Sequence, residues 1–219
     1  MNNVLHVENI TMQFGGVVAV NNLSLDIPEN QIVALIGPNG AGKTTAFNCI
    51  TGVYQPTNGL VEFMGKPMVR SRPGGKMKKQ YKGENAELYG AEHAIHNTPD
   101  KITKLGIART FQNIRLWKSM TVFDNVLVAK HMRAKQNVFS AIFRGNKKEE
   151  KRMREETKKL FAELEVDIDP DEKVEELTPS QKQLLEISKA LFFNAKLLIL
   201  DEPTNGLDPI GIQELRSLI

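Results

Sequence analysis

The stretch GPNGAGKTT, residues 37–45, decides the fold of this chain because it follows the pattern G-x-x-x-x-G-K-[ST]. Glycines let a backbone curve closely around a phosphate group, so that successive N–H groups point inward. A helix that begins near Lys43 adds the positive end of its dipole. The Lys43 side chain can reach the β- and γ-phosphates of a nucleotide, and the Thr44 hydroxyl can bind Mg²⁺. The residues expected to hold the phosphates are Gly37, Pro38, Asn39, Gly40, Ala41, Gly42, Lys43, Thr44 and Thr45.

The segments beside this loop favour a functional phosphate site over a chance glycine-rich turn. QIVALI, residues 31–36, is predicted to be a buried strand, and KTTAFNCITG, residues 43–52, is predicted to be a helix closed by Gly52. Cys49 on that helix is interpreted as a small core residue, since no acid or base pattern marks it as a nucleophile.

Short strand-like runs lie on both sides of the loop. VLHVENITMQF, AVNNLSLDI and GLVEFMG, residues 4–14, 19–27 and 59–65, predict an antiparallel β portion near the N-terminus. Residues 69–90 are basic, contain glycine and are poor in aliphatic side chains, which predicts a surface insertion or a mobile arm. A solvated loop is the default interpretation of these charges, and contact with phosphate or lipid is the alternative.

A helical pattern covers the middle of the chain, and a strand follows it. Met153, Leu160, Phe161 and Leu164 recur at helical spacing, which predicts one buried stripe under a charged face. AKLLILDEP, residues 195–203, predicts a short buried strand.

Strands that alternate with helices and a glycine-rich first turn indicate an α/β fold. We expect a P-loop NTPase core in a single domain over residues 1–219, with a helical subdomain at about 113–190 as a second, smaller layer.

Composition is typical of a soluble cytosolic protein. Hydrophobic residues make up 41% of the 219 residues and charged residues 25%. No apolar stretch approaches the roughly 20 residues of a membrane span, and the N-terminus lacks a secretion signal. The single cysteine cannot form an internal disulfide, which suits a reducing compartment. A net charge of +3 is too weak to indicate nucleic acid as a partner.

Two adjacent carboxylates, Asp201 and Glu202, end the apolar run of residues 197–200. Ligands of open α/β sheets bind where strands end, so Asp201 is expected to bind Mg²⁺ through water and Glu202 to polarise an attacking water. A strand-ending turn is the alternative, which the phosphate loop makes less favourable. No N-K-x-D element for reading guanine is present, so GTP is disfavoured. Phe14 is interpreted as either an adenine-stacking aromatic or a buried strand residue.

Three motifs in this order, GPNGAGKTT, RTFQN and LLILDEPTNGLDP, resemble the ATP-binding subunits of ABC transporters. The resemblance covers nearly the whole chain. MQFGGVVAVNNLSLDI and GIARTFQNIRLWKSMTVFDNV are most similar to branched-chain amino-acid importers, whereas residues 166–203 also resemble sugar-importer ATPases. Because both kinds of importer are resembled, the transported solute stays open. The interpretation as an ATPase subunit is not affected.

The resemblance implies ATP and Mg²⁺ as cofactors and assigns roles to individual residues. Phe14 would stack on adenine, and Asp208 would lie at a dimer seam. Gln112 would contact the metal and the attacking water, and Glu202 would act with it in catalysis. The residues implied at the metal are Thr44, Gln112 and Asp201.

The resemblance also implies partners. Two ATPase subunits, identical or different, would close over two ATP molecules and move transmembrane permease subunits at the cytoplasmic face of the cell membrane. A solute-binding protein would act indirectly. Residues 115–126 would line the groove that receives a permease helix, and Trp117 there is either a partner contact or a core anchor.

The family signature Leu-Ser-Gly-Gly-Gln aligns with LTPSQ, residues 177–181, so both glycines are missing. Thr178 and Gln181 form a T-x-x-Q capping box, and Pro179 falls at the first helical position, where proline is favoured. The N–H groups of Ser180 and Gln181 and the Ser180 hydroxyl are still expected to face a partner's phosphate, and Thr178 is counted with them among the nucleotide-binding residues. We therefore expect a weakened signature.

The family also places a γ-phosphate histidine after the catalytic glutamate, beyond a further strand. The sequence ends at Ile219, and His6, His93, His96 and His131 all lie upstream, so we expect a fragment that lacks C-terminal core strands. A nucleotide-binding clamp or truncated remnant without effective hydrolysis is the alternative function. A two-domain ABC protein acting on ribosomes or DNA is disfavoured, because one set of motifs is present.

Overall fold

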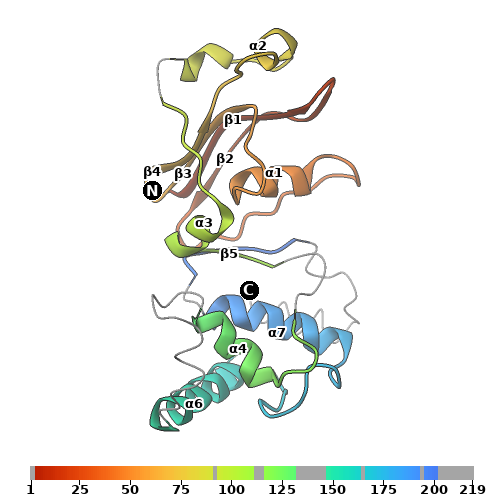
Figure 1. Cartoon of the computed structure of the whole chain (residues 1–219), viewed down its shortest axis with the longest axis vertical. Coiled ribbons are helices and arrows are strands. Elements are labelled where there is room, and N and C mark those ends of the chain that lie inside the picture. Colours follow the sequence, from red (N-terminus) through yellow and green to blue (C-terminus); the bar gives the residue numbers. More distant parts are fainter. Residues whose placement is uncertain are drawn as a thin grey trace. The chain divides into compact units, whose positions relative to one another are not determined.

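The computed structural model describes residues 3–90, 93–110, 116–131, 147–163, 166–192 and 195–201. The chain divides into two compact units, Met1–Ile107 and Ala108–Ile219. The first holds an antiparallel sheet and the second holds packed helices with two short strands (Figure 1). The predicted α/β class is confirmed.

A four-stranded antiparallel sheet forms the frame of the first unit, with the strand order β2-β1-β3-β4. Its strands are β1 (Asn3–Phe14), β2 (Val17–Pro28), β3 (Asn58–Phe63) and β4 (Lys66–Ser71). Leu5 and Val7, two positions apart on β1, are almost fully buried, and the run from Ile10 to Gln13 is buried as well. The β portion predicted near the N-terminus is therefore confirmed.

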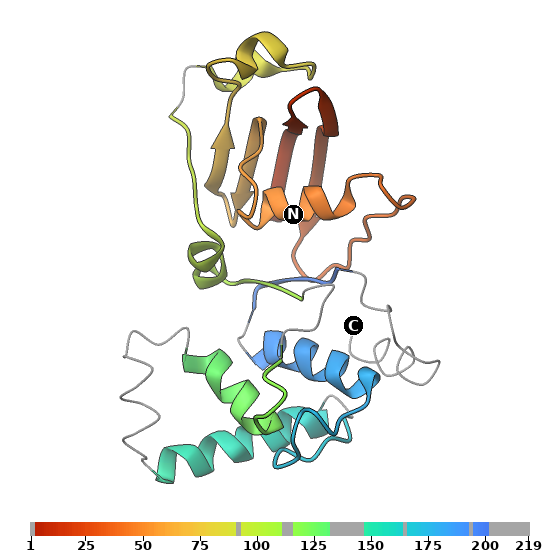
Figure 2. The same cartoon turned by 45° about the vertical axis from the view of Figure 1, so that its right-hand side comes forward.

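Helix α1 (Lys43–Ile50) lies against β1 and β2, as Figure 2 shows. It buries Cys49 completely, which confirms this cysteine as a core residue, and burial raises the pKa of its thiol to about 12. The helix is closed by Gly52, as predicted. Gly52 has a φ of +72°, and a Cβ there would lie 2.3 Å from the carbonyl oxygen of Asn97.

The strand predicted at residues 31–36 is not formed, and no described strand pairs with this segment. Most of its apolar side chains are exposed, Ile32 by 72% and Ile36 by 90%. An apolar run predicts burial but does not identify a hydrogen-bonding neighbour, and a strand forms only where another strand pairs with it. The prediction of a buried strand before the phosphate loop was wrong.

Most of the predicted basic insertion is attached to the sheet by buried polar side chains. Residues 69–71 belong to β4, and the short helices α2 (Met77–Gln80) and η1 (Ala86–Tyr89) follow. The buried side chain of Gln13 donates to the carbonyl oxygen of Gln80 at 2.8 Å and accepts from the N–H of Lys82 at 3.2 Å. These bonds fix the middle of the insertion to β1.

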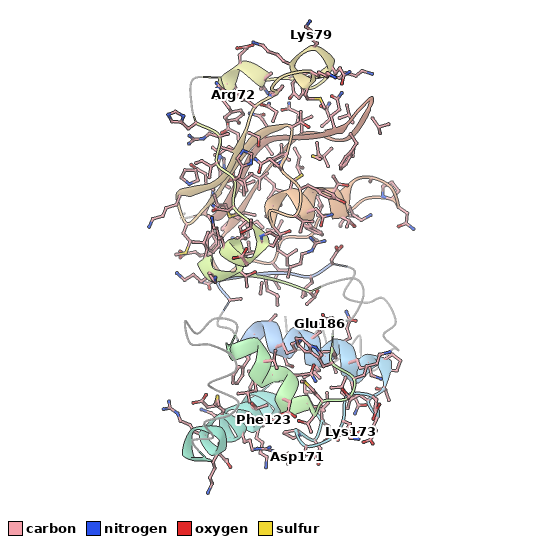
Figure 3. The ribbon with its side chains drawn as sticks, in the orientation of Figure 1. Arg72, Lys79, Phe123, Asp171, Lys173 and Glu186 are labelled. Carbon is pink, nitrogen blue, oxygen red and sulfur yellow. The ribbon has the colours of Figure 1, made fainter. Side chains whose placement is uncertain are left out.

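A second attachment involves the hydroxyl of Tyr81, which accepts from the buried Asn58 amide at 3.0 Å. Lys79 on α2 is exposed and points away from the sheet (Figure 3). Helix α3 (Pro99–Leu105) then leads to the end of the first unit. The insertion therefore exposes charged side chains such as Lys79, while the buried Gln13 and Asn58 side chains of the sheet fix it in place.

Three helices, α4 (Val122–His131), α6 (Lys147–Glu163) and α7 (Pro179–Phe192), pack against one another in the second unit (Figure 1). Met153 and Phe161 are buried and Leu160 is partly buried, so these members of the predicted stripe face the core; Leu164 lies outside the described residues. The apolar side chains at the centre of this packing are Val122, Val126, Phe161, Val166, Ile168, Val174, Leu177, Leu184 and Leu185.

A cation on α6 joins this helix to its neighbours. The guanidinium carbon of Arg154 lies 4.3 Å from the ring centroid of Phe123, and the same side chain pairs with Asp171; both partners are labelled in Figure 3. The N–H of Phe123 donates to the carbonyl oxygen of Pro170 at 2.8 Å. The segment before α7 is thereby held against α4 and α6.

Two short strands, β5 (Ile107–Arg109) and β6 (Leu197–Ile199), form a separate two-stranded sheet. The N–H of Thr110 extends the pairing by donating to the carbonyl oxygen of Ile199 at 3.0 Å. Strand β6 is the one predicted within AKLLILDEP, and Asp201 follows it by two residues. The pairing brings the ends of β5 and β6 together.

Candidate functional site

The phosphate loop forms a turn that leads directly into α1. Gly40 and Gly42 have φ values of +81° and +86°, which L side chains rarely adopt. A Cβ at Gly42 would also lie 2.3 Å from the carbonyl oxygen of Ala19 on β2. The N–H of Ala41 donates to the carbonyl oxygen of Pro38 at 3.2 Å, which closes the turn. Backbone conformation and contact with the sheet both require glycine at position 42.

The Lys43 side chain folds back onto the loop. Its Nζ donates to the carbonyl oxygens of Gly37 at 2.6 Å and Pro38 at 2.9 Å. Both acceptors are neutral carbonyl oxygens, whereas a phosphate oxygen carries negative charge and adds a Coulombic attraction for the ammonium. A phosphate that enters the loop therefore attracts the Lys43 ammonium more strongly than the carbonyl oxygens of Gly37 and Pro38 do.

The first turn of α1 is open to a ligand. Gly42 is its N-cap and supplies no side-chain hydrogen bond, and the turn contains no acidic residue. Thr44 in this turn is exposed. A helix N-terminus without a side-chain cap, beside a lysine and a hydroxyl group, is suited to an anion accompanied by a cation.

Phe14 ends β1 and is 46% exposed, so it is not the buried strand residue that the sequence left as an alternative. The ring of Tyr54 stands nearly perpendicular to it, with the centroids 5.5 Å apart. Sequence reasoning missed Tyr54, and its position shortly after Gly52 was the only available signal. Stacking of adenine on Phe14 stays a prediction.

Asp201 is buried and paired. Its Oδ2 accepts a hydrogen bond from Nη2 of Arg109 at 2.6 Å, and the two side chains are only 4% and 9% exposed. Sequence reasoning missed Arg109, although it stands in the quoted motif RTFQN. No local pattern could have identified the pair, because the two residues are 92 positions apart. The carboxylate expected near the metal is therefore held by a cation of the chain itself.

The helix start at Thr178 is the capping box that the sequence predicts. The Thr178 N–H donates to Oε1 of Gln181 at 2.9 Å, and the Gln181 N–H donates to Oγ1 of Thr178 at 3.2 Å. Helix α7 begins at Pro179, as predicted. The N–H of Gln181, which we expected to face a phosphate, thus has a partner inside the chain, and a phosphate would have to replace it.

The loop that carries Trp117 is fixed by the buried side chain of Asn125. Its Oδ1 accepts from the Trp117 N–H at 2.9 Å, and its Nδ2 donates to the Trp117 carbonyl oxygen at 3.0 Å. The indole ring is 48% exposed, and Nζ of Lys189 lies 5.8 Å from its centroid. Burial lowers the pKa of Lys189. Because the ring is half exposed, Trp117 is not a core anchor.

Three residues with expected roles, Gln112, Glu202 and Asp208, lie outside the described part of the chain. The metal that the resemblance implies is Mg²⁺, which takes oxygen ligands and keeps several waters beside substrate phosphates. The hydroxyl of Thr44 and the carboxylate of Asp201 are each donors of that kind, so each fits the metal by its own chemistry. Among the described residues, no three His, Cys, Asp or Glu side chains gather into a metal cluster.

Comparison with known proteins agrees with these motifs. The sequence pattern of the ABC transporter family matches residues 20–205. The chain is 35% identical over 218 residues to the high-affinity branched-chain amino acid transport ATP-binding protein BraF of Pseudomonas aeruginosa, covering 99% of this chain and 75% of BraF. It is 30% identical over 217 residues to the galactose/methyl galactoside import ATP-binding protein MglA of Clostridium perfringens, covering 99% of this chain and 35% of MglA.

Solved structures show the same fold. A nucleotide-free ATP-binding cassette from an ABC transporter superposes with a TM-score of 0.72 at 28% identity, covering 99% of this chain and 76% of the cassette. None of the helices described here is long and apolar enough to cross a membrane.

Proposed function

The chain belongs to the ABC transporter family, and from that premise we propose that it is the ATP-binding and ATP-hydrolysing subunit of an importer for branched-chain amino acids. The observation that carries the proposal is the phosphate loop, where Lys43 and the open first turn of α1 offer positive charge and N–H donors to a triphosphate. Similarity to BraF supports the solute class, and similarity to MglA supports import more broadly.

ATP binding begins with an exchange of hydrogen bonds at the loop. The Lys43 ammonium leaves the carbonyl oxygens of Gly37 and Pro38 for the β- and γ-phosphates. This exchange is favourable because charged oxygens replace neutral ones. The exposed rings of Phe14 and Tyr54 offer surface for adenine.

Hydrolysis is assigned to residues that follow β5 and β6. Glu202 orients the attacking water and accepts its proton, and Gln112 contacts the same water. Asp201 and the Thr44 hydroxyl are the residues that would hold the metal, Asp201 through a water. Mg²⁺, when bound with ATP, neutralises charge on the β- and γ-phosphates. The buried position of Asp201 supports its assignment, because a buried carboxylate is oriented by its surroundings.

A second ATPase subunit, identical or homologous, completes each ATP site in the proposed complex. Thr178, Ser180 and Gln181 contact the γ-phosphate of the ATP held by the partner, and Asp208 lies at the seam. Because the Gln181 N–H must first leave the Thr178 hydroxyl, part of the binding free energy is lost in that exchange. ATP favours the closed pair since it has its full contacts only there.

Permease subunits are the proposed membrane partners. The half-exposed Trp117 and the exposed Met120 stand on a loop that Asn125 holds in one conformation, and such a surface is suited to receive a helix. The subunit would then lie on the cytoplasmic face of the membrane as a peripheral protein. A solute-binding protein would act indirectly, by delivering solute to the permeases.

Uptake of labelled leucine tests this proposal. The chain is co-expressed with the permease subunits and solute-binding protein of a branched-chain amino-acid importer that lacks this ATPase. We expect uptake to depend on the chain, to disappear in Lys43→Ala, and to fall in Trp117→Ala while ATP binding is kept. Uptake of galactose instead would reassign the solute, and ATP binding without uptake or hydrolysis would identify a nucleotide clamp.

A further inference from the structure

We propose that Arg109 is a positioning residue that sets the Mg²⁺ requirement of nucleotide binding through its ion pair with Asp201. The inference rests on the proposed function, because it concerns the metal that accompanies ATP. It assigns a role to the arginine of the motif RTFQN, whose neighbour Gln112 is already assigned to catalysis.

The backbone around the pair fixes where both side chains start. Arg109 is the last residue of β5, and the following N–H, of Thr110, donates to the carbonyl oxygen of Ile199 at the end of β6. Asp201 follows Ile199 by two residues. The ion pair at 2.6 Å therefore links the ends of two hydrogen-bonded strands.

Arg109 bonds to one oxygen of the Asp201 carboxylate and not to the other. Oδ2 of Asp201 accepts from Arg109, and no donor among the described residues bonds to Oδ1. Because a carboxylate is rigid and planar, holding Oδ2 fixes the direction of Oδ1. The arginine thus presents one oxygen of Asp201 for a water molecule of a metal shell, which is the contact that Mg²⁺ prefers to make.

The charge of the arginine works against the metal. A buried carboxylate is costly unless a positive charge lies beside it, and Arg109 supplies that charge when no metal is present. The same charge repels an incoming cation. Arg109 therefore stabilises the metal-free protein and raises the Mg²⁺ concentration that nucleotide binding requires.

The experiment titrates MgCl₂ into the full chain with a trinitrophenyl-labelled ATP and measures fluorescence, alongside the thermal unfolding midpoint with and without Mg²⁺. The variants are Arg109→Met, which removes the charge, and Arg109→Lys, which keeps it but loses the planar fork. Arg152→Met is the matched control, since Arg152 is 80% exposed and, among the described residues, pairs only with Glu156 on its own helix.

We expect Arg109→Met to lower the Mg²⁺ concentration at half-maximal binding about tenfold, because a neighbouring positive charge is gone. Its unfolding midpoint should fall without Mg²⁺ and largely recover with Mg²⁺ and ATP. Arg109→Lys should keep both values near those of the unsubstituted protein, and Arg152→Met should change neither.

A midpoint that falls equally with and without Mg²⁺, together with an unchanged Mg²⁺ dependence, would overturn the proposal and leave Arg109 a purely structural role. If Arg109→Met does not fold, Arg109→Gln decides by the same two measurements. An unsubstituted chain that binds no labelled ATP at any Mg²⁺ concentration would overturn the proposed function itself, whereas normal binding with an unchanged dependence in the variants overturns only the role of Arg109.

Discussion

Thr178 and Gln181 cap each other at the start of α7, through the Gln181 N–H to the Thr178 hydroxyl at 3.2 Å and the Thr178 N–H to the Gln181 side chain at 2.9 Å. In the proposed function these residues take the place of the family's signature, where the resemblance implies glycines that leave the backbone open to a partner's ATP. The helix begins with a complete capping box, and the N–H groups of Thr178 and Gln181 already have hydrogen-bond partners within the chain. Two opposite consequences follow, one for stability and one for ATP.

Thr178→Ala should destabilise the protein by about 1 kcal/mol, because a capping side chain at a helix N-terminus is lost. The measurement is the free energy of unfolding in urea. Thr98→Ala is the matched control, since Thr98 is the N-cap of α3 but makes no capping hydrogen bond. Equal losses in the two variants would show that the cap at Thr178 contributes nothing specific.

Restoring the glycines should act in the other direction on ATP. Pro179→Gly combined with Ser180→Gly opens the backbone to the partner's γ-phosphate, so we expect faster cooperative ATP hydrolysis at a lower ATP concentration. Stability should fall slightly, because glycine costs helix propensity and proline is favoured at the first position. The measurement is the ATPase rate against ATP concentration. No gain in rate or in ATP affinity would show that the two side chains are no handicap.

Gln13→Ala should release the basic insertion from the sheet. The buried Gln13 side chain donates to the carbonyl oxygens of Gly15 and Gln80 and accepts from the N–H of Lys82. We expect a loss of about 1–3 kcal/mol, since polar groups lose their partners, and faster protease cleavage within residues 72–90. The exposed Gln31→Ala serves as the control. Cleavage at the rate of the unsubstituted protein would mean that other contacts suffice to hold the insertion.

The pair of His6 and Asp26 should make stability weakly dependent on pH. The hydrogen bond from His6 Nδ1 to Asp26 Oδ1, 2.7 Å long, raises the pKa of His6 above 6.5 in the folded state. The stabilisation is therefore complete below about pH 6.5 and is lost as the pH rises through the folded pKa. Because the two side chains are 36% and 53% exposed, solvent screening limits it to less than ~1 kcal/mol.

Asp26→Asn removes the charge that raises this pKa. The difference in unfolding free energy between about pH 5.5 and about pH 8.5 should then shrink relative to the unsubstituted protein. A pH dependence that stays the same in Asp26→Asn would assign it to other groups.

Features set by a few neighbouring residues could be predicted from the sequence. The capping box needs only Thr178 and Gln181, three positions apart, and Gly52 closes α1 because a left-handed residue is needed there. The β-strands at the N-terminus follow from alternation of polar and apolar side chains. In each case the physical cause lies within one element.

Features that depend on a distant partner could not be predicted. The strand expected at residues 31–36 is not formed because no described strand pairs with it, and an apolar pattern does not say which strand will. Arg109 and Asp201 meet only because β5 pairs with β6. Tyr54 approaches Phe14 for the same kind of reason, since the end of α1 and the end of β1 belong to one packed unit.

The central claim is that the chain binds ATP and hydrolyses it, and Glu202→Gln tests this most directly. ATP binding and steady-state phosphate release are measured together on the full chain with Mg²⁺. We predict that Glu202→Gln binds ATP as the unsubstituted protein does and loses turnover by about 10²–10⁴-fold, because the water loses its general base. ATP binding with the same turnover, or none, in both proteins would contradict the account and identify a nucleotide-dependent clamp.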